Sequence, residues 1–525
     1  MRKSVKKLVS VFLALMLVAA VAAPATTAYA ESVSVIPTVL IGGRNRGMEI
    51  YTPEGEKVFP IGDTLDAKKI ASAVMTCIPY LGAGMLTGDY QPWADQFYKA
   101  IAPYYEKILC DGNGDIAATS LETKYDYSNP QPTSINECDY AFNYDWRIDP
   151  CQAADYLETY ITNILAATGS KKVNLVGRCY GGTILSAYLY EYGCEKVHTA
   201  VYYVSISQGT GLRVSELFAG KFMFDPQCIE DMFLDSDIKG YYEKFVEDPV
   251  LRELILATLN LLNTLDTLNI PFDKLSEFVN KVYPELAPKI VPATYGTFAS
   301  IWSMVAAEDY EQAKALVFKG QEDKYAGLIE KIDHYHYDIQ ANEAAMLKEL
   351  QDEGMRVGFV VKYGVPHCVP FTVSSKVNGD NAVEVFRSSL GATAADYGEV
   401  LTDEQIAAAN PKYLSSDHVI DASTCAFPEY TWFIKDCEHS TFAASIDKLN
   451  LAICNSEDEM TVDSDPNYPQ FMKFDRQTEE IAPLTDEPSV RVKDNSLSAI
   501  LRKLSSLMKL LFTLVKNLFD KISSK

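Results

Sequence analysis

One short motif restricts the fold of this chain more than any other feature. The apolar run Val173–Val176 predicts a buried strand, Gly181–Tyr192 predicts a helix, and Gly177-Arg178-Cys179-Tyr180-Gly181 joins the two. Glycines on both sides of a central residue remove the Cβ clashes of a sharp strand-to-helix turn, so the central side chain projects above the end of the strand. We therefore expect Cys179 at the edge of a parallel sheet, with a helix N-terminus behind it.

A cysteine at such a turn has the chemistry of a nucleophile. The thiolate is the attacking species, and a free thiol has a pKa near ~8.5. A helix N-terminus, a neighbouring cation such as Arg178 and a histidine partner all favour the thiolate. The alternative is a buried or disulfide-bonded Cys179 on an inactive turn.

Nucleophiles on turns of this kind are followed along the chain by an acid and then by a histidine. His439 follows a predicted strand ending near residue 435 and starts a predicted helix over 441–454, which makes it the expected base; His418 is the alternative. The expected acid, which would orient the imidazole, is Asp417. Asp421 and Asp380 remain alternatives, and each of the three could instead be a turn or cap residue.

Two backbone donors are expected to stabilise the oxyanion. The N–H of Tyr180 is one, because the residue after the nucleophile begins the helix. The second is expected from the glycine-rich loop Gly42–Gly47, at Asn45 or Arg44, although that loop could equally be an ordinary turn.

Strand and helix patterns alternate from residue 37 onward, which predicts an α/β fold with a mostly parallel central sheet and helices on both faces. Between residues 217 and 352 the pattern is helix after helix, which indicates an inserted cap. The expected organisation is a signal peptide at 1–30, the two parts of the α/β core at 31–216 and 353–455, the helical cap or lid at 217–352, an acidic linker at 456–495 and a cationic amphipathic helix at 496–525.

Both ends of the chain carry localisation signals. Basic residues at the start, an apolar stretch and Ala28-Tyr29-Ala30 are typical of a signal peptide, so the protein is expected to be secreted. The last thirty residues place leucines on one helical face and lysines on the other. This helix is expected either to contact a membrane surface or to pack on the domain or on a second copy.

Composition excludes some partners. The chain has 71 acidic against 47 basic residues, a net charge of −24, so nucleic acid is not an expected partner. Eleven cysteines are scattered without a C-x-x-C pair or a regular metal-ligand spacing, which disfavours zinc, and no cofactor is expected. The odd number leaves at least one thiol without an intramolecular disulfide partner.

These motifs together resemble the lecithin:cholesterol acyltransferase and lysosomal phospholipase A2 family over most of residues 35–455. The resemblance is carried by the turn at Cys179 and by the segments 37–43, 55–60, Tyr144-Asp145-Trp146-Arg147, 363–366 and those around Asp417 and His439. It implies an α/β-hydrolase core with a lid, acting on lipid acyl esters through a Ser-Asp-His triad. For Tyr144–Arg147 we expect a structural role, with an aromatic ring packed beside an Asp–Arg pair.

Two positions depart from the family pattern. The family has serine where Cys179 stands, and usually Gly-Asp-Gly around the acid, where this chain has Ser416-Asp417-His418. The turn and the Asp417-His418-Val419 string also resemble polyhydroxyalkanoate synthases, intracellular enzymes that carry acyl chains on a cysteine as thioesters. The sequence thus predicts a secreted lipase- or phospholipase-like hydrolase with a Cys-His-Asp triad. An acyltransferase, or an inactive lipid- or surface-binding homologue, is the alternative.

Overall fold

The computed structural model describes residues 36–43, 48–59, 67–116, 119–121, 125–211, 214–225, 227–228, 272–367, 369 and 371–490. The predicted signal peptide and the cationic helix at 496–525 lie outside these residues, as do Arg44, Asn45 and much of the first half of the predicted cap. In the part of the chain that is described, none of the helices is both long and apolar enough to cross a membrane.

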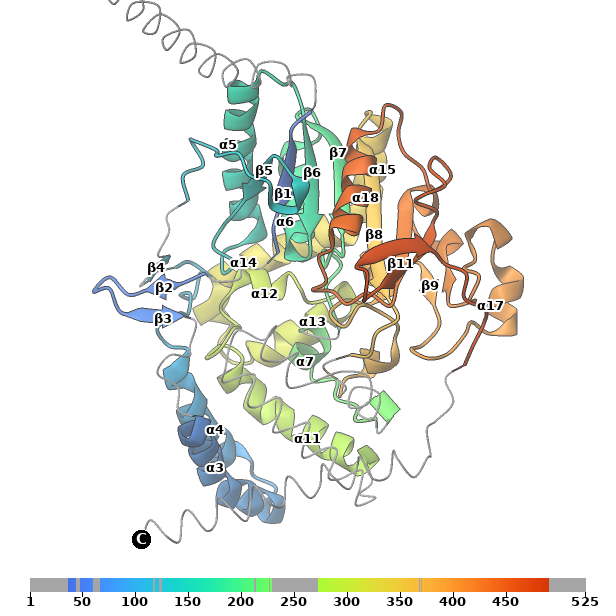
Figure 1. The fold of residues 1–525 in the computed structure, drawn as a ribbon. Coiled ribbons are helices and arrows are strands. Elements are labelled where there is room, and N and C mark those ends of the chain that lie inside the picture. Colours follow the sequence, from blue (N-terminus) through green and yellow to red (C-terminus); the bar gives the residue numbers. More distant parts are fainter. Residues whose placement is uncertain are drawn as a thin grey trace, which may run out of the picture.

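An eight-stranded sheet forms the centre of the molecule (Figure 1). Its order is β13-β12-β11-β8-β7-β6-β1-β5, and every neighbouring pair is parallel except β12 with β13. The strands are β1 (Thr38–Ile41), β5 (Tyr140–Phe142), β6 (Val173–Arg178), β7 (Val197–Tyr203), β8 (Arg356–Tyr363), β11 (Thr431–Lys435), β12 (Phe471–Asp475) and β13 (Glu480–Pro483). The mostly parallel sheet predicted from the sequence is confirmed.

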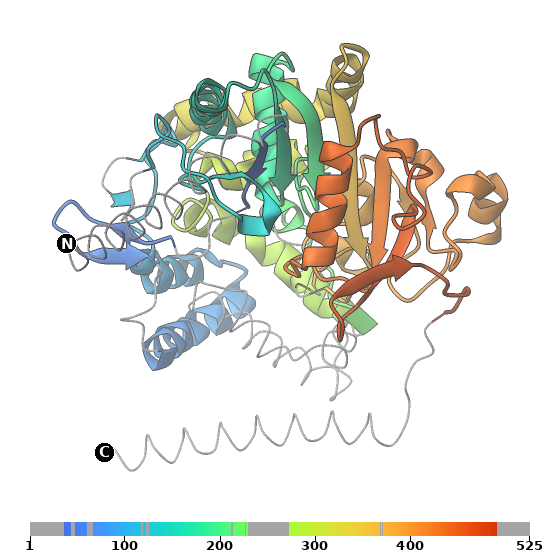
Figure 2. The same ribbon diagram turned by 45° about the horizontal axis from the view of Figure 1, so that its top comes forward.

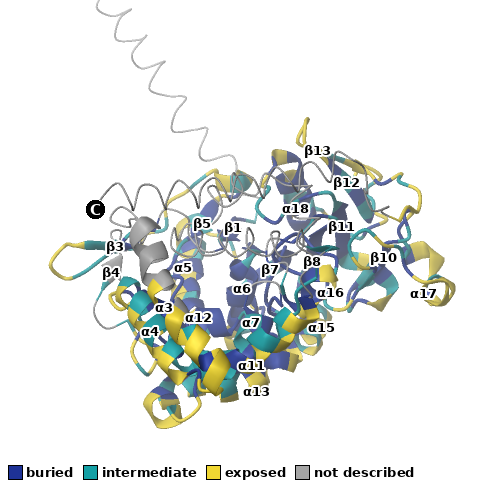
Figure 3. Ribbon diagram, turned by 90° about the horizontal axis from the view of Figure 1, so that it is seen from below, coloured by how far each residue is buried: buried dark blue, intermediate teal, exposed yellow. Residues whose placement is uncertain are grey.

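Helices cover both faces of this sheet, because its central strands are apolar on both sides. In β1, Val39 and Ile41 join the same core cluster as residues of α5 (Pro150–Thr168) and α6 (Tyr180–Tyr192). Leu40, pointing the other way, joins the cluster of α18 (Ala444–Asn455). Figure 2 shows α18, in orange, in front of the strands, and Figure 3 shows buried residues gathered along the sheet.

The chain changes direction across the sheet between β1 and β6. From β1 it runs outward to β5, and from β6 it runs the other way through β7, β8 and β11. Ligands of open α/β sheets bind at such a switch point, beyond the carboxyl ends of the strands. With the turn at Cys179 placed between β6 and α6, this is the α/β-hydrolase fold.

Two excursions leave the sheet. Between β1 and β5 lie a small sheet of β2 (Ile50–Tyr51), β3 (Lys57–Phe59) and β4 (Ser120–Leu121) and the helices α3 (Ala67–Thr87) and α4 (Gln91–Ile101). Between β7 and β8, where the sequence predicts the cap, the structure has α7 (Ser215–Ala219), α11 (Phe272–Ile290), α12 (Ala299–Trp302), α13 (Ala307–Val317), α14 (Ala326–His334) and α15 (Glu343–Asp352). α11 packs on α4, so the two excursions touch (Figure 1).

A third region, between β8 and β11, carries short elements that surround the loops of the site. They are α16 (Val385–Ser388), β9 (Thr393–Ala394), α17 (Asp403–Ala408) and β10 (Ile420–Asp421). β9 and β10 pair with each other and lie outside the main sheet.

The prediction of an acidic linker at 456–495 is wrong, because residues 471–483 supply the last two strands of the sheet. Met472 and Phe474 are buried against the core around α18, while Phe471 and Lys473 between them are half-buried. This period-two pattern is short and is surrounded by acidic residues and prolines, so the composition of the segment masked it.

Candidate active site

Cys179 lies at the tip of a strained turn between β6 and α6. Its backbone has φ 57° and ψ −123°, an unfavourable conformation for a residue with a Cβ and one that recurs at nucleophile turns. The turn packs closely against the end of β1, because a Cβ at Gly181 would lie 2.0 Å from the carbonyl oxygen of Ile41. Cys179 is a free thiol and is not held in a disulfide.

The backbone after β1 lies against the sulfur. A Cβ at Gly43 would come within 3.0 Å of the Cys179 Cβ and 3.4 Å of its Sγ. The hydroxyl of Tyr144 donates to the carbonyl oxygen of Gly42 at 2.7 Å and fixes this approach. The loop predicted to supply an oxyanion donor therefore starts beside the nucleophile, while Arg44 and Asn45 themselves lie outside the described residues.

His439 is held by Asp380. Its Nδ1 lies 2.7 Å from Asp380 Oδ2, and its backbone N–H donates to the Asp380 carbonyl oxygen at 2.8 Å. The other carboxylate oxygen accepts from the backbone N–H groups of Ala382 and Val383 at 3.0 and 2.9 Å. Asp380 is fully buried and His439 is 8% exposed, so water competes little for this pair.

The electrostatics of the three groups favour a thiolate and an imidazolium. Burial alone would raise the pKa of Cys179, but the charge and hydrogen-bonding capacity of His439 and the backbone N–H of Tyr180 lower it below the ordinary value. Burial likewise opposes the charge on His439, yet Asp380 and Cys179 raise its pKa to about 9. The pKa of Asp380 is lowered against the effect of burial by His439 and the two amides.

The nitrogen of His439 that faces the nucleophile is not engaged elsewhere. Nε2 is buried and has no hydrogen-bond partner of good geometry among the described residues. Its interaction with Cys179 is therefore close enough to shift both pKa values but not aligned as a finished hydrogen bond. Such loose geometry is common in catalytic pairs without substrate.

The structure places the predicted acid elsewhere. Asp417 accepts from Ser415 Oγ at 2.7 Å and pairs with Lys435 Nζ at 2.7 Å, so its carboxylate is engaged with these two side chains. Asp421 accepts from Ser423 N and Oγ at 2.9 and 2.6 Å and caps a short helical turn. The prediction of Asp417 as the partner of His439 is wrong, and Asp380, kept as an alternative, takes that position.

The alternative base, His418, is not the histidine that pairs with Asp380, because that carboxylate contacts His439. His439 itself stands in the loop before α18, five residues ahead of the first helical residue, Ala444, rather than at the helix start.

The sequence did contain a signal for the carboxylate that holds His439. Asp380 stands in Gly379-Asp380-Asn381, which differs from the Gly-Asp-Gly of the resembled family only at the last residue. Asn381 has φ 77°, and asparagine is among the non-glycine residues that tolerate this conformation best. The segment therefore closely matches the Gly-Asp-Gly pattern, with asparagine in place of the last glycine at a position of positive φ.

Lys362 supports the histidine loop and was not expected from the sequence. This lysine of β8 is 1% exposed, and its Nζ donates to the carbonyl oxygens of Glu438, His439 and Thr441 at 3.3, 3.5 and 2.5 Å. Its ammonium also lies over the Tyr203 and Phe442 rings. The signal in the sequence was one charged residue, Lys362, inside the otherwise uncharged strand Val357–Tyr363.

The Tyr144–Arg147 segment is structural, as expected. Arg147 is fully buried and makes two bonds to Asp145, at 3.0 and 2.7 Å, and one to Thr119 Oγ1 at 2.7 Å. Trp146 packs edge-on against Phe298 of the cap. The segment thus joins the core, the cap and, through Tyr144, the backbone beside Cys179.

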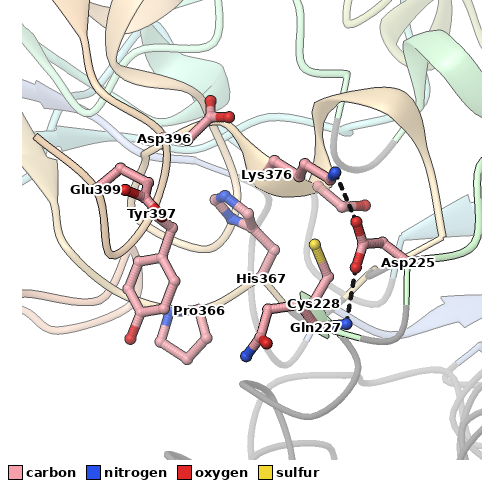
Figure 4. Close-up of a pocket in the computed structure, with 10 residues that line it drawn as sticks. Asp225, Gln227, Cys228, Pro366, His367, Lys376, Asp396, Tyr397 and Glu399 are labelled. Carbon is pink, nitrogen blue, oxygen red and sulfur yellow. Dashed lines mark hydrogen bonds and ion pairs between the residues drawn. The ribbon is translucent and has the colours of Figure 1, made fainter. Parts of the chain in front are cut away.

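A cavity of about 230 Å³ lies beside the loop that follows β8 (Figure 4). Asp225 contributes to its wall and pairs with Lys376 Nζ at 2.6 Å, while the backbone N–H of Gln227 donates to Asp225 Oδ1 at 2.7 Å. His367, Asp396 and Glu399 are among its other lining residues, which do not include Cys179 or His439.

Comparison with known proteins adds little to this geometry. No family model matches the chain, and no curated protein matches it either. One solved structure is similar, the crystal structure of a mutant meta-cleavage product hydrolase (CumD), with a TM-score of 0.21 and 13% identity over 60% of this chain and 72% of that one. The fold assignment therefore rests on the strand order and on the turn at Cys179.

Proposed function

We propose that this protein is a cysteine-dependent acyl-ester hydrolase with Cys179, His439 and Asp380 as its catalytic groups. The observation that carries the proposal is the pairing of the partly exposed Cys179, at the strained turn, with His439, whose Nδ1 lies 2.7 Å from the buried Asp380. In this pair the pKa of the thiol is lowered and that of the imidazole is raised to about 9. Such a pair supplies a thiolate as the nucleophile and an imidazolium that can protonate the leaving group, both in one site.

The reaction would proceed in two steps. The thiolate of Cys179 attacks the ester carbonyl carbon, and the oxygen that becomes negative accepts a hydrogen bond from the backbone N–H of Tyr180. Collapse breaks the carbon–oxygen bond of the ester, and the imidazolium of His439 gives its proton to the departing alkoxide. Water then attacks the acyl-thioester, giving its proton to His439, and the acid leaves as the thiolate is restored. Asp380 holds the imidazole and stabilises its charge throughout.

For the substrate we propose a lipid acyl ester. The resemblance to the lecithin:cholesterol acyltransferase and lysosomal phospholipase A2 family supports this class, and the helical insertion between β7 and β8 suits the lid that the resemblance implies. We also propose that the protein is exported and that its cationic C-terminal helix, residues 496–525, contacts anionic membrane surfaces.

Acyl transfer is the second candidate, and the cysteine itself favours it. A thioester reacts with alcohols as well as with water, so an acceptor alcohol in the second step would give a new ester in place of a free acid. The first step and the three catalytic groups are the same for both reactions.

Steady-state assays of the purified protein test the proposal. Short- and long-chain p-nitrophenyl esters, thioesters and phospholipid vesicles, each with and without a long-chain alcohol, are offered to the parent, Cys179→Ala and Cys179→Ser. Cys425→Ala, which alters a different free thiol that is buried, is the control. We expect Cys179→Ala to lose activity on every substrate that the parent cleaves, with Cys425→Ala unchanged.

Mass spectrometry of the products separates hydrolysis from transfer, since a free acid indicates water and a new ester indicates the alcohol. A Cys179→Ala protein as active as the parent would remove the mechanism. A parent inactive on every acyl ester and thioester would favour the non-catalytic homologue.

A further inference from the structure

A second cluster of reactive side chains lies on three helices, apart from the triad. Cys151 is in the first turn of α5, Glu191 is near the end of α6, and His334 is the last residue of α14. One ligand atom from each of them lies within 4.8 Å of the other two. Each residue is at least partly exposed, so an ion from solvent can reach them.

The donor set matches that of a zinc site. Zn²⁺ is bound by thiolate sulfur, imidazole nitrogen and carboxylate oxygen, with ligand bonds of about 2.0–2.3 Å. His334 Nε2 is 3.0 Å from Glu191 Oε1, close to the separation of two ligands on a tetrahedral ion. Three protein ligands leave one position open for water.

The surroundings of His334 also fit. Its Nδ1 lies 2.8 Å from Asp338 Oδ2, the carboxylate–histidine arrangement that orients a metal-binding imidazole through its second nitrogen. The Tyr190 ring meets the imidazole edge-on at a centroid distance of 5.7 Å and restricts its rotation. The ring is thus held with Nε2 directed at Glu191.

We propose that Cys151, Glu191 and His334 form a surface site for Zn²⁺ or a similar thiophilic divalent ion, with Asp338 as the partner of the histidine. The site joins the cap to the core, because α14 belongs to the excursion between β7 and β8 whereas α5 and α6 pack on the central sheet. The ligands are 40 and 143 residues apart in sequence, so no local spacing reveals them. A bound ion would tie the three helices together and stabilise the folded protein.

Metal titration of the full chain tests the site independently of any enzymatic activity. The background is Cys179→Ala, because Cys179 and His439 could offer a competing sulfur–nitrogen pair. Zn²⁺ is titrated into metal-free protein by calorimetry, and Co²⁺ is used as a spectroscopic probe of thiolate coordination. Cys151→Ser and His334→Gln each remove one ligand, and Asp338→Asn alters only the partner of Nδ1.

Cys194→Ser is the matched control, since its sulfur lies 3.5 Å from a carboxylate oxygen of Glu353. We expect one equivalent of tightly bound Zn²⁺, a cobalt–thiolate charge-transfer band and a higher Tm with metal. Cys151→Ser and His334→Gln should lose all three, Asp338→Asn should bind about 10- to 100-fold more weakly, and Cys194→Ser should be unchanged.

Circular dichroism of the metal-free variants checks that each is folded. Less than one equivalent of Zn²⁺ on the parent background would overturn the site. Binding by folded Cys151→Ser or His334→Gln as strong as that of Cys194→Ser would overturn it as well.

Discussion

At the scale of single residues, the site depends on which carboxylate holds His439. Asp380 is fully buried and bonded to the imidazole, whereas Asp417 is engaged with Lys435 and Ser415. Asp380→Asn keeps the shape but presents an amide to Nδ1, which favours the wrong tautomer and withdraws the charge that stabilises the imidazolium. We expect kcat to fall by about 10⁴-fold, as when the orienting carboxylate of such a triad is replaced.

Asp417→Asn is the matched control for this prediction. It leaves Lys435 with a weakened partner and should lower stability by about 1–3 kcal/mol while changing kcat little. The two variants are compared in the same ester assay and by thermal unfolding. The assignment is wrong if Asp417→Asn abolishes activity and Asp380→Asn does not.

Lys362 gives a second prediction at this scale. Its buried ammonium donates to three carbonyl oxygens of the loop that carries His439. Lys362→Met leaves these oxygens without their donor, so we expect a lower Tm and a fall in kcat of at least about 10-fold with little change in KM, since a displaced catalytic group costs rate rather than binding.

Lys412→Met is the control, because Lys412 pairs with Asp463 on an exposed surface, where such a pair contributes less than about 1 kcal/mol. Kinetics across pH complete the test, because a misplaced His439 also shifts the pH profile. A Lys362→Met enzyme with parental kcat and pH profile would show that the ammonium has no positioning role.

The sequence predicted Cys179 and His439, which the structure brings together, but not the carboxylate that holds the imidazole. Cys179 is marked by glycines at fixed offsets around a strand-to-helix turn, and His439 by its place after the last long apolar strand of the core. Aspartates are frequent between β8 and β11, and order along the chain does not fix which of them folds back on the imidazole. The folded loop at Asp380–Asn381 is what brings one of these aspartates to His439.

At the scale of elements, the turn at Cys179 is held by its contact with β1. A Cβ at Gly181 would lie 2.0 Å from the Ile41 carbonyl oxygen, and backbone atoms cannot move aside cheaply. We expect Gly181→Ala to lower the free energy of unfolding by about 2–4 kcal/mol, the range of severe packing defects, and to abolish activity. Denaturant unfolding and the ester assay measure both effects.

Gly82→Ala tests the opposite case, since a Cβ there meets nothing within 4 Å and the residue lies inside α3. It should be neutral or stabilise the protein by up to about 1 kcal/mol. Equal effects of the two substitutions would contradict the close approach of the turn to β1.

Elements with a strong periodic pattern were predictable, and those defined by long-range pairing were not. The strands at 173–178 and 356–363 and the helix at 150–168 follow local apolar patterns. β12 pairs with the edge of β11 and β13 pairs with β12, whereas β2 and β4 are two residues long. Such strands carry too few residues for a period to be read.

At the scale of the whole molecule, the cysteines divide into two groups. Burial raises the pKa of many of them, including Cys110 and Cys138 to about 12. Among the described cysteines with a shifted pKa, Cys179 is the one whose pKa is lowered. In the absence of a bound ion, burial thus disfavours the thiolate at these other cysteines, while His439 favours it at Cys179, at the switch point of the sheet.

The rate of alkylation of each thiol across pH tests the central claim, the pairing of Cys179 with His439 and Asp380. The native protein is treated with iodoacetamide from acidic to alkaline pH, and peptide mass spectrometry follows every cysteine. We predict that Cys179 reacts first and stays reactive well below the pH at which a free thiol ionises, and that Asp380→Asn moves its profile towards that of a free thiol. Cys179 reacting like the buried cysteines, or a profile unaffected by Asp380→Asn, would contradict the account.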